Sequence, residues 1–276
     1  MKTRLSLSKS VLSIYAYGLI ILMLIPMAAL VPISFGDSAT MSALPEHFSL
    51  RWYREVLGGS QWREAFSWSL ITSCLATLMS TVIGYLGAYL LVHSSSKMKG
   101  VLEIILLMPV MVPTVIVAFS TYILSNWLPA ESNWLLIAVG QALLGLPIAT
   151  LIIAAGLRDI DISIIRAAIS LGGKRHQIFL WIILPMARHG IVSAAALSFL
   201  IAFDELLVAL FLTKPGLETL PLRIYDAVTY ELTPAIAVVS VFLMALIALA
   251  LIVGNCLKSR GTRGVPPDAQ FIARGK

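Results

Sequence analysis

Two adjacent carboxylates, Asp204 and Glu205, interrupt an apolar stretch from about 190 to 213 that is long enough to span a bilayer. A charge at the centre of a spanning helix costs about 2.5 to 3.5 kcal/mol on insertion scales, so it usually faces a cavity or a partner. One chemistry that fits is compensation of the charge of an ammonium-bearing solute. The alternatives are capping of a helix break, pairing with Arg or Lys of another chain, or a position near the outer interface. Because adjacent helical residues point about 100° apart, both cannot face one pore equally.

A second pattern lies between Arg166 and Pro185, where the chain reads R-A-A-I-S-L-G-G-K-R-H-Q-I-F-L-W-I-I-L-P. Isoleucines at spacings of three and four predict a short helix with one apolar face, which Asp161 or Ser163 can cap. This stripe consists of Ile162, Ile165 and Ile169.

The double glycine Gly172-Gly173 predicts the end of that helix. A second short helix is expected over 174–184, and Pro185 disfavours helical geometry in the residue before it. Its apolar surface is formed by Phe179, Trp181 and Ile182. Two short helices at an angle form a compact knob, which either packs against its own bundle or binds a partner.

Few other residues could support catalysis or hold a metal. Cys74 and Cys256 lie inside apolar runs without a C-x-x-C pair, so we expect neither a disulfide nor a metal site. The three histidines near the apolar runs, His93, His176 and His189, lie at the end of a predicted span or in the regions between spans. We expect no catalytic residue and no cofactor, and the sequence has no P-loop glycine signature.

The composition places most of the chain in lipid. Hydrophobic residues make up 59% of the 276 residues and charged residues only 12%, which leaves too little polar surface to cover a soluble core. A hydrocarbon core of about 30 Å needs roughly 20 apolar residues per spanning helix. The sequence goes that far without a charge at 10–36, 65–92, 104–130, 132–157 and 232–257, and 190–213 adds a sixth candidate.

We therefore predict an all-α membrane protein with six transmembrane helices in one membrane domain, 10–257. The predicted spans are about 11–33, 65–93, 101–125, 134–157, 190–213 and 234–257, between tails 1–9 and 258–276. Pro109 and Pro113 predict a kink in the third span. Residues 158–189 form the largest loop after the fourth span and are called the coupling loop below.

The basic residues predict the orientation. With the N-terminus in the cytoplasm, fifteen of the twenty Lys and Arg lie inside, which matches the positive-inside rule. The five left outside are Arg51, Arg54, Arg63, Lys214 and Arg223. Both termini and the coupling loop are then cytoplasmic. This asymmetry accounts for the net charge of +6 and favours membrane topology over nucleic-acid binding.

The spacing in the coupling loop resembles the EAA loop of the permease subunits of bacterial ATP-binding-cassette importers, which have a MetI-like fold. Its pattern is E-A-A, three residues, G, nine residues, I-x-L-P. The matching residues are Ala167, Ala168, Gly172, Ile182, Leu184 and Pro185. The resemblance implies that this loop binds a separate ATPase in a groove and passes its motion to the membrane helices. Arg166 stands where the family usually has glutamate, which would change the matching charge on the partner.

A wider resemblance covers most of 60–257 and is to the permeases of spermidine and putrescine importers. It is carried by A-F-D-E-L-L-V-A-L-F-L from Ala202, T-L-P-L-R-I-Y from Thr219 and E-L-T-P-A-I-A from Glu231. The resemblance implies a bacterial inner-membrane location, a dimer of ATPase subunits, a second homologous permease and a periplasmic binding protein. Permeases for phosphonates, iron or opine-like amino-acid derivatives share versions of these motifs and remain an alternative. A secondary carrier would need internal repeats and more intramembrane charge than we find.

The segment from Lys214 to Glu231 is predicted to lie outside. It opens with the turn-forming Lys214-Pro215-Gly216. By resemblance, Thr219, Leu220 and Pro221 contact the docked binding protein or gate the outer mouth, and an ordinary connecting loop is the alternative.

Overall fold

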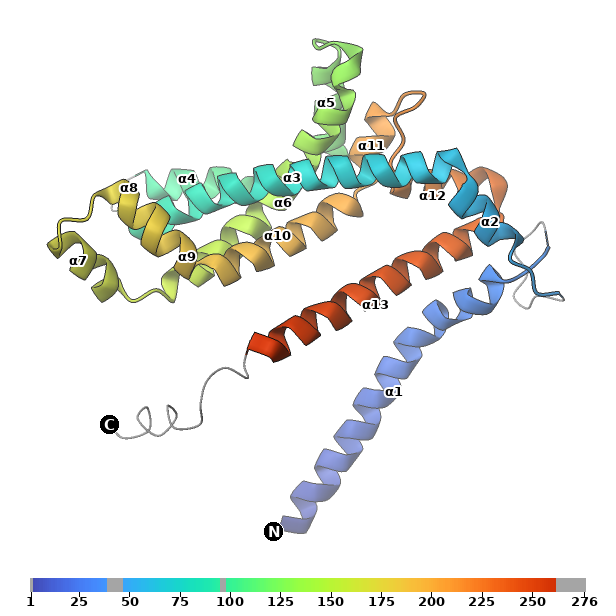
Figure 1. Cartoon of the computed structure of the whole chain (residues 1–276), viewed down its shortest axis with the longest axis horizontal. Helices are drawn as coiled ribbons and strands as arrows, with labels where there is room; N and C mark the ends of the chain where they lie inside the picture. Colours follow the sequence, from blue (N-terminus) through green and yellow to red (C-terminus); the bar gives the residue numbers. More distant parts are fainter. Residues whose placement is uncertain (1, 39–46, 95–97, 262–276) are drawn as a thin grey trace. The chain divides into compact units, whose positions relative to one another are not determined.

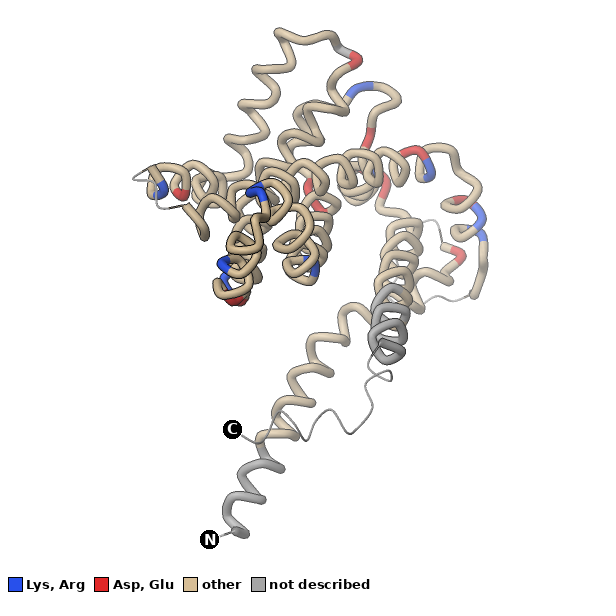
Figure 2. Tube along the Cα trace, turned by 60° about the vertical axis from the view of Figure 1, so that its left-hand side comes forward, with Lys and Arg blue, Asp and Glu red and all other residues tan. Residues whose placement is uncertain are grey.

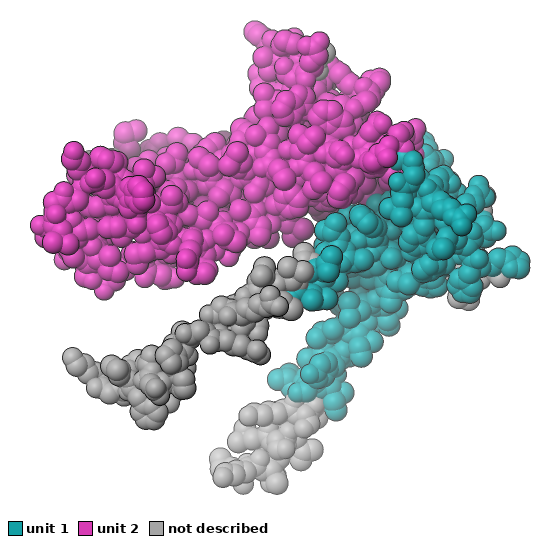
Figure 3. Space-filling view, in the orientation of Figure 1, with its two compact units in different colours: residues 1–59, 227–276 teal, residues 60–226 magenta. Residues whose placement is uncertain are grey.

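In the computed structural model, which describes residues 2–38, 47–94 and 98–261, every regular element is a helix (Figure 1). The chain divides into two compact units, 60–226 and 1–59 with 227–276, where one membrane domain was predicted (Figure 3). The division arises because the first and last long helices pack against each other, whereas the helices within 60–226 form a core of their own.

The larger unit is built around three helices, α3, α6 and α10, which pack against one another. Its helices are α3 (Ser60–His93), α4 (Lys99–Leu107), α5 (Thr114–Ser125), α6 (Asn133–Arg158), α7 (Ile162–Ser170), α8 (Arg175–Ile178), α9 (Leu184–Met186), α10 (Arg188–Phe203), α11 (Leu207–Leu212) and α12 (Leu220–Asp226). Small residues let the long helices approach closely, as membrane helices require. A Cβ on Gly84 of α3 would lie 3.0 Å from Cβ of Ala149 on α6.

The smaller unit consists of α1 (Lys2–Ser34), α2 (Arg51–Gly58) and α13 (Ala235–Gly261). Helix α13 contacts both α1 and α2. Trp52 and Val56 are the buried residues of α2. Of the predicted tail 258–276, residues 262–276 lie outside the described residues. The predicted tail 1–9 is helical from Lys2.

Three described helices are long and apolar enough to cross a membrane: Leu12–Ser34, Ser60–His93 and Asn133–Arg158. Two bent helix pairs, Lys99–Met111 with Thr114–Ser125 and Arg175–Met186 with Arg188–Phe203, pass the same test and raise the number to five. The sixth predicted span corresponds to α13, whose described apolar part is Ala235–Leu249. Figure 2 shows charged residues at helix ends and in loops, separated by long uncharged stretches.

The third predicted span, 101–125, is broken rather than merely kinked. Its two halves meet at 100°, with a 3-10 turn over Met108–Met111 and extended backbone at Val112. Pro109 and Pro113 provide no backbone N–H, so the helical hydrogen-bond ladder cannot continue through them. The predicted span 190–213 is also interrupted, because α10 ends at Phe203 and α11 begins at Leu207.

Pro185 does not end the second helix of the coupling loop, contrary to the prediction. The chain widens into a π-helical turn over Phe179–Ile183, in which the N–H of Leu184 donates to the carbonyl of Phe179. Pro185 then lies in the first turn of α9, where a missing N–H is tolerated. The sharp bend, 70°, comes after Met186 instead.

Candidate coupling loop and membrane break

Helix α7 forms the outermost part of the coupling loop, and none of its residues is buried. It begins at a capped N-terminus, where the N–H of Ser163 donates to Oδ1 of Asp161 over 2.8 Å. This hydrogen bond holds the pKa of the Asp161 carboxyl below its ordinary value, so the cap is charged at neutral pH. Ile162 and Ile169 of the predicted stripe are 56% and 58% exposed, whereas Ile165 packs against the core.

A glycine turn reverses the chain after α7. Gly172 has a φ of +83°, a left-handed conformation that L side chains rarely adopt. The N–H of Gly173 donates to the carbonyl of Ala168 over 3.0 Å, which satisfies a carbonyl at the end of the helix. The next segment starts at Lys174, whose N–H donates to Oε1 of Gln177 over 3.0 Å.

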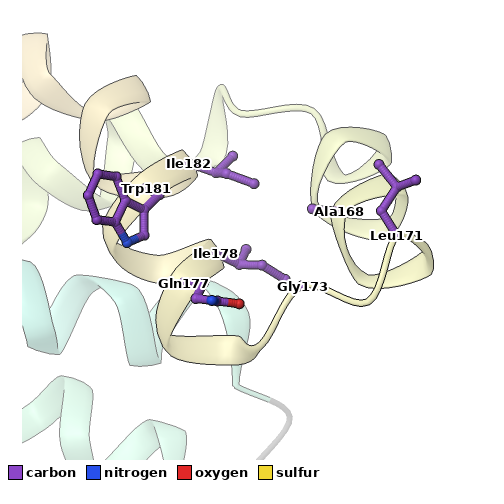
Figure 4. Close-up of a pocket in the computed structure, with 7 residues that line it drawn as sticks. All are labelled: Ala168, Leu171, Gly173, Gln177, Ile178, Trp181 and Ile182. Atoms are coloured by element: carbon purple, nitrogen blue, oxygen red, sulfur yellow. The ribbon is translucent and has the colours of Figure 1, made fainter.

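The reversal leaves a hollow between α7 and the segment from α8 to α9 (Figure 4). The cavity has a volume of about 460 Å³. Its lining residues come from both sides of the turn and are Ala168, Leu171, Gly173, Gln177, Ile178, Trp181 and Ile182. Leu171 and Trp181 are 88% and 77% exposed, so large apolar groups on this loop lie in contact with solvent.

The far side of the same segment is fixed to the long helices. Phe179 packs between two tyrosines of α3, with ring centroids 5.0 Å from Tyr85 and 4.7 Å from Tyr89. The Tyr85 hydroxyl donates to the carbonyl of Phe179 over 3.4 Å. Ile178 and Ile183 are buried in the same cluster, together with α6 residues such as Ile153 and Leu157. The loop therefore has one exposed part, α7, and one part packed against α3 and α6.

The predicted coupling residues divide between these two parts. Arg166 and Ala167 are exposed on α7, and Pro185 is exposed at the start of α9. Ala168 and Ile182 face each other across the hollow. Phe179 and Leu184 pack against the core.

Sequence reasoning missed Leu171, Gln177 and the two tyrosines of α3. The position of Leu171 directly before the double glycine was a usable signal, because a residue at a helix end beside a tight turn projects from the surface. No sequence signal pairs Tyr85 or Tyr89 with Phe179, about 90 residues away.

The break between α10 and α11 gives Asp204 and Glu205 different surroundings. Glu205 is 8% exposed, and its carboxylate accepts hydrogen bonds from the N–H groups of Leu207, at 2.8 Å to Oε1, and Val208, at 2.9 Å to Oε2. It thus caps the N-terminus of α11, where unpaired N–H groups and the helix dipole favour an anion. Asp204 is exposed at the C-terminal end of α10. Among the alternatives given for this pair, capping of a helix break describes Glu205, whereas Asp204 is exposed and its role stays a prediction.

Helix α11 is held in place by α5 and α6. Val208 is fully buried, and a Cβ on Gly140 of α6 would lie 2.7 Å from its Cγ1. At the other end of α11, the Nδ2 of Asn133 donates to the carbonyl of Leu212 over 2.8 Å. The capped break therefore lies in a tightly packed setting.

The predicted outer contact residues are mostly buried. Thr219 and Leu220 are 1% and 3% exposed, and the N–H of Leu220 donates to Oγ of Ser69 on α3 over 2.7 Å. Their side chains therefore cannot form a surface for another protein in this fold. Pro221 is half-buried beside them. The turn before them is attached to α3 as well, because Nε1 of Trp68 donates to the carbonyl of Gly216 over 2.8 Å.

Comparisons with known proteins identify the family. The profile described as "Binding-protein-dependent transport system inner membrane component" matches residues 80–260. The chain is 27% identical to the putrescine transport system permease protein PotI of Escherichia coli K12, over 91% of each chain. It is 29% identical to the spermidine/putrescine transport system permease protein PotC of Haemophilus influenzae, over 90% of this chain and 93% of that one.

Solved structures agree on the fold. A chain of a bacterial ABC transporter involved in import of the acidic polysaccharide alginate matches with a TM-score of 0.72 at 18% identity, covering 91% of this chain and 95% of that chain. A chain of an amino acid ABC transporter matches with a TM-score of 0.56 at 19% identity, over 75% of this chain. The predicted MetI-like permease fold is confirmed, and the chain belongs to the family of inner-membrane components of binding-protein-dependent transport systems.

Proposed function

We propose that the chain forms half of the translocation path of an ATP-driven importer for putrescine or spermidine. The observation that supports this choice of substrate is the similarity to PotI and PotC over at least 90% of the chain. Asp204 supports it, because an exposed carboxylate at a break in a membrane segment suits a cationic solute. The same permease class acting on another small solute is the alternative.

The partners of the proposed importer are a pair of ATPase subunits, a second homologous permease and a periplasmic binding protein. The coupling loop and both termini are assigned to the cytoplasm, as the basic residues predict. Arg166, Ala167 and Ala168 on α7 contact the ATPase. Phe179 and the residues of the motif that follow transmit its motion, because they pack against the core on the other side of the loop.

Helix α3 provides a mechanical connection through the protein. Near one end it holds Phe179 of the coupling loop between Tyr85 and Tyr89. Near the other end it is hydrogen-bonded to Gly216 and Leu220. Ser69 and Tyr85 are 16 positions apart, which corresponds to about 24 Å at a rise of 1.5 Å per residue. A displacement of the coupling loop is thereby passed to the segment 214–222, which we assign to the outer gate.

The proposal is tested by energy-dependent uptake of labelled putrescine and spermidine in cells with and without the gene, with the binding protein expressed in both. We expect uptake to be lost without the gene and to be competed by unlabelled polyamines but not by anionic solutes. Uptake that is unchanged by deletion would contradict the polyamine assignment. A membrane preparation in which the chain purifies without any ATPase would contradict the importer assignment.

A further inference from the structure

We propose that the hollow between α7 and the α8–α9 segment is a socket for an apolar side chain of the ATPase subunit, and that the ATPase surface around that side chain is acidic. The inference rests on the proposed function, because it specifies the chemistry of the partner at the same loop. It makes the contact reciprocal: α7 enters the groove of the ATPase, and a projection of the ATPase enters this chain.

The shape of the hollow fits a side chain from another protein. The hollow has a volume of about 460 Å³ and is wide open to solvent, so a side chain from another protein can reach its lining residues. Five of its seven lining residues are apolar side chains, contributed from both sides of the Gly172 turn. An aliphatic or aromatic side chain placed there would contact α7 and the α8–α9 segment at once.

The rim of the hollow has the composition of a protein interface. Leu171 and Trp181 remain 88% and 77% exposed on a loop with little other reason to expose apolar surface. Tryptophan in particular is enriched among residues that dominate binding energy. Burying these two groups against a partner removes apolar area from water and favours association.

Charge specifies the partner further. No Asp or Glu occurs between Ile162 and Ala187, while Arg166, Lys174 and Arg175 are exposed on the same stretch of chain as the residues that line the hollow. The preceding Asp161 is engaged in capping α7. A complementary partner therefore presents carboxylates around its apolar side chain.

An anionic lipid surface would also match this charge, but it fits the shape poorly. Headgroups are fluid and present no fixed apolar projection to fill a hollow, and amphipathic helices that bind membranes offer a convex apolar face. Leu171 and Trp181 border a concavity instead. The shape therefore favours a protein partner over lipid.

The test uses the full chain in its purified complex, with a photoreactive amino acid placed at Leu171 or, separately, at Trp181. A matched control carries it at Ile162, which is 56% exposed on α7 and does not line the hollow. We expect both rim positions to crosslink to one ATPase peptide that contains an apolar residue flanked by Asp or Glu, and the control to crosslink elsewhere. Crosslinks from the rim to lipid, to a permease chain or to a basic peptide would overturn the proposal.

Substitutions provide a second measurement. Arg166→Glu should reduce the amount of ATPase retained on the purified permease about tenfold, and replacing the facing acidic residue of the crosslinked peptide by Arg should restore it. Failure of restoration, with both proteins folded, would contradict the charge assignment. If the wild-type chain retains no ATPase at all, the proposed function fails; if it retains ATPase but crosslinks from other positions, only the socket fails.

Discussion

At the scale of residues, Asp204 and Glu205 are adjacent carboxylates with different surroundings. Glu205 is 8% exposed and its carboxylate is occupied by the N–H groups at the start of α11. Asp204 is exposed one residue earlier, where α10 ends. Glu205 therefore caps α11, and our proposal that the path contacts the solute through a carboxylate rests on Asp204.

The two amide substitutions should therefore affect different properties of the protein. Glu205→Gln keeps one acceptor oxygen but loses the second and the charge, so it should reduce stability by about 2 kcal/mol, the scale of a hydrogen bond to a charged group. Asp204→Asn should leave the thermal unfolding temperature in detergent unchanged and lower polyamine uptake at saturating binding protein. Normal uptake in Asp204→Asn would remove this residue from the path.

The close contact at Gly140 predicts a second residue-scale effect. Gly140→Ala places a Cβ 2.7 Å from Cγ1 of the fully buried Val208, so α6 and α11 must separate. Overpacking of this kind costs typically about 1 to 3 kcal/mol. Gly100→Ala is the matched control, since nothing lies within 4 Å of its added Cβ. Equal unfolding temperatures for the two variants would show that the α11 packing is looser than described.

At the scale of elements, the coupling loop combines an exposed helix with an anchored segment. The turn between them requires a positive φ at Gly172. Gly172→Ala forces a Cβ into the left-handed region at a cost of about 1 to 2 kcal/mol, whereas asparagine tolerates that conformation better. We expect uptake and ATPase retention to fall in Gly172→Ala and to recover partly in Gly172→Asn. Equal losses in both would indicate that the glycine is needed for space rather than for conformation.

The aromatic contact between the loop and α3 predicts uncoupling. Phe179→Ala removes the ring that packs against Tyr85 and Tyr89, so ATP hydrolysis should continue while polyamine uptake per ATP falls several-fold. Tyr85→Phe is the control, because it removes only a 3.4 Å hydrogen bond and keeps the ring. A parallel loss of hydrolysis and uptake in Phe179→Ala would point to a folding defect instead of transmission.

Several elements follow from local sequence and several do not. The apolar runs predict the bounds of α3 and α6 closely. Asp161 caps the start of helix α7, and the turn at Gly172 follows its end, as predicted. Pro109 and Pro113 predict where the third span is interrupted. They do not predict the 100° angle between its two halves, because that angle depends on packing. The prediction from Pro185 was wrong because this proline lies in the first turn of α9, directly after a π-helical turn, where its missing N–H is tolerated. The hydrogen bond from Leu220 to Ser69 joins residues about 150 positions apart, so local sequence patterns could not predict it.

At the scale of the whole molecule, the proposed importer has a fixed sidedness. In this proposal the coupling loop meets an ATPase in the cytoplasm, and the segment 214–222 meets the solute from the periplasm. A single cysteine at Ser170, in a background where Cys74 and Cys256 are replaced by serine, should react with a membrane-impermeant thiol reagent only from the cytoplasmic side. Lys214→Cys should react only from the periplasmic side. The reverse pattern would invert the topology and remove the basis for the coupling loop.

The most direct test of the central claim measures uptake by the complete complex in proteoliposomes whose orientation has been established with the Ser170 label. We predict that labelled putrescine moves only when ATP is present on the side of α7 and the binding protein on the opposite side. Uptake without ATP, or uptake driven by ATP on the side of the binding protein, would contradict the claim that this loop receives the motion of an ATPase.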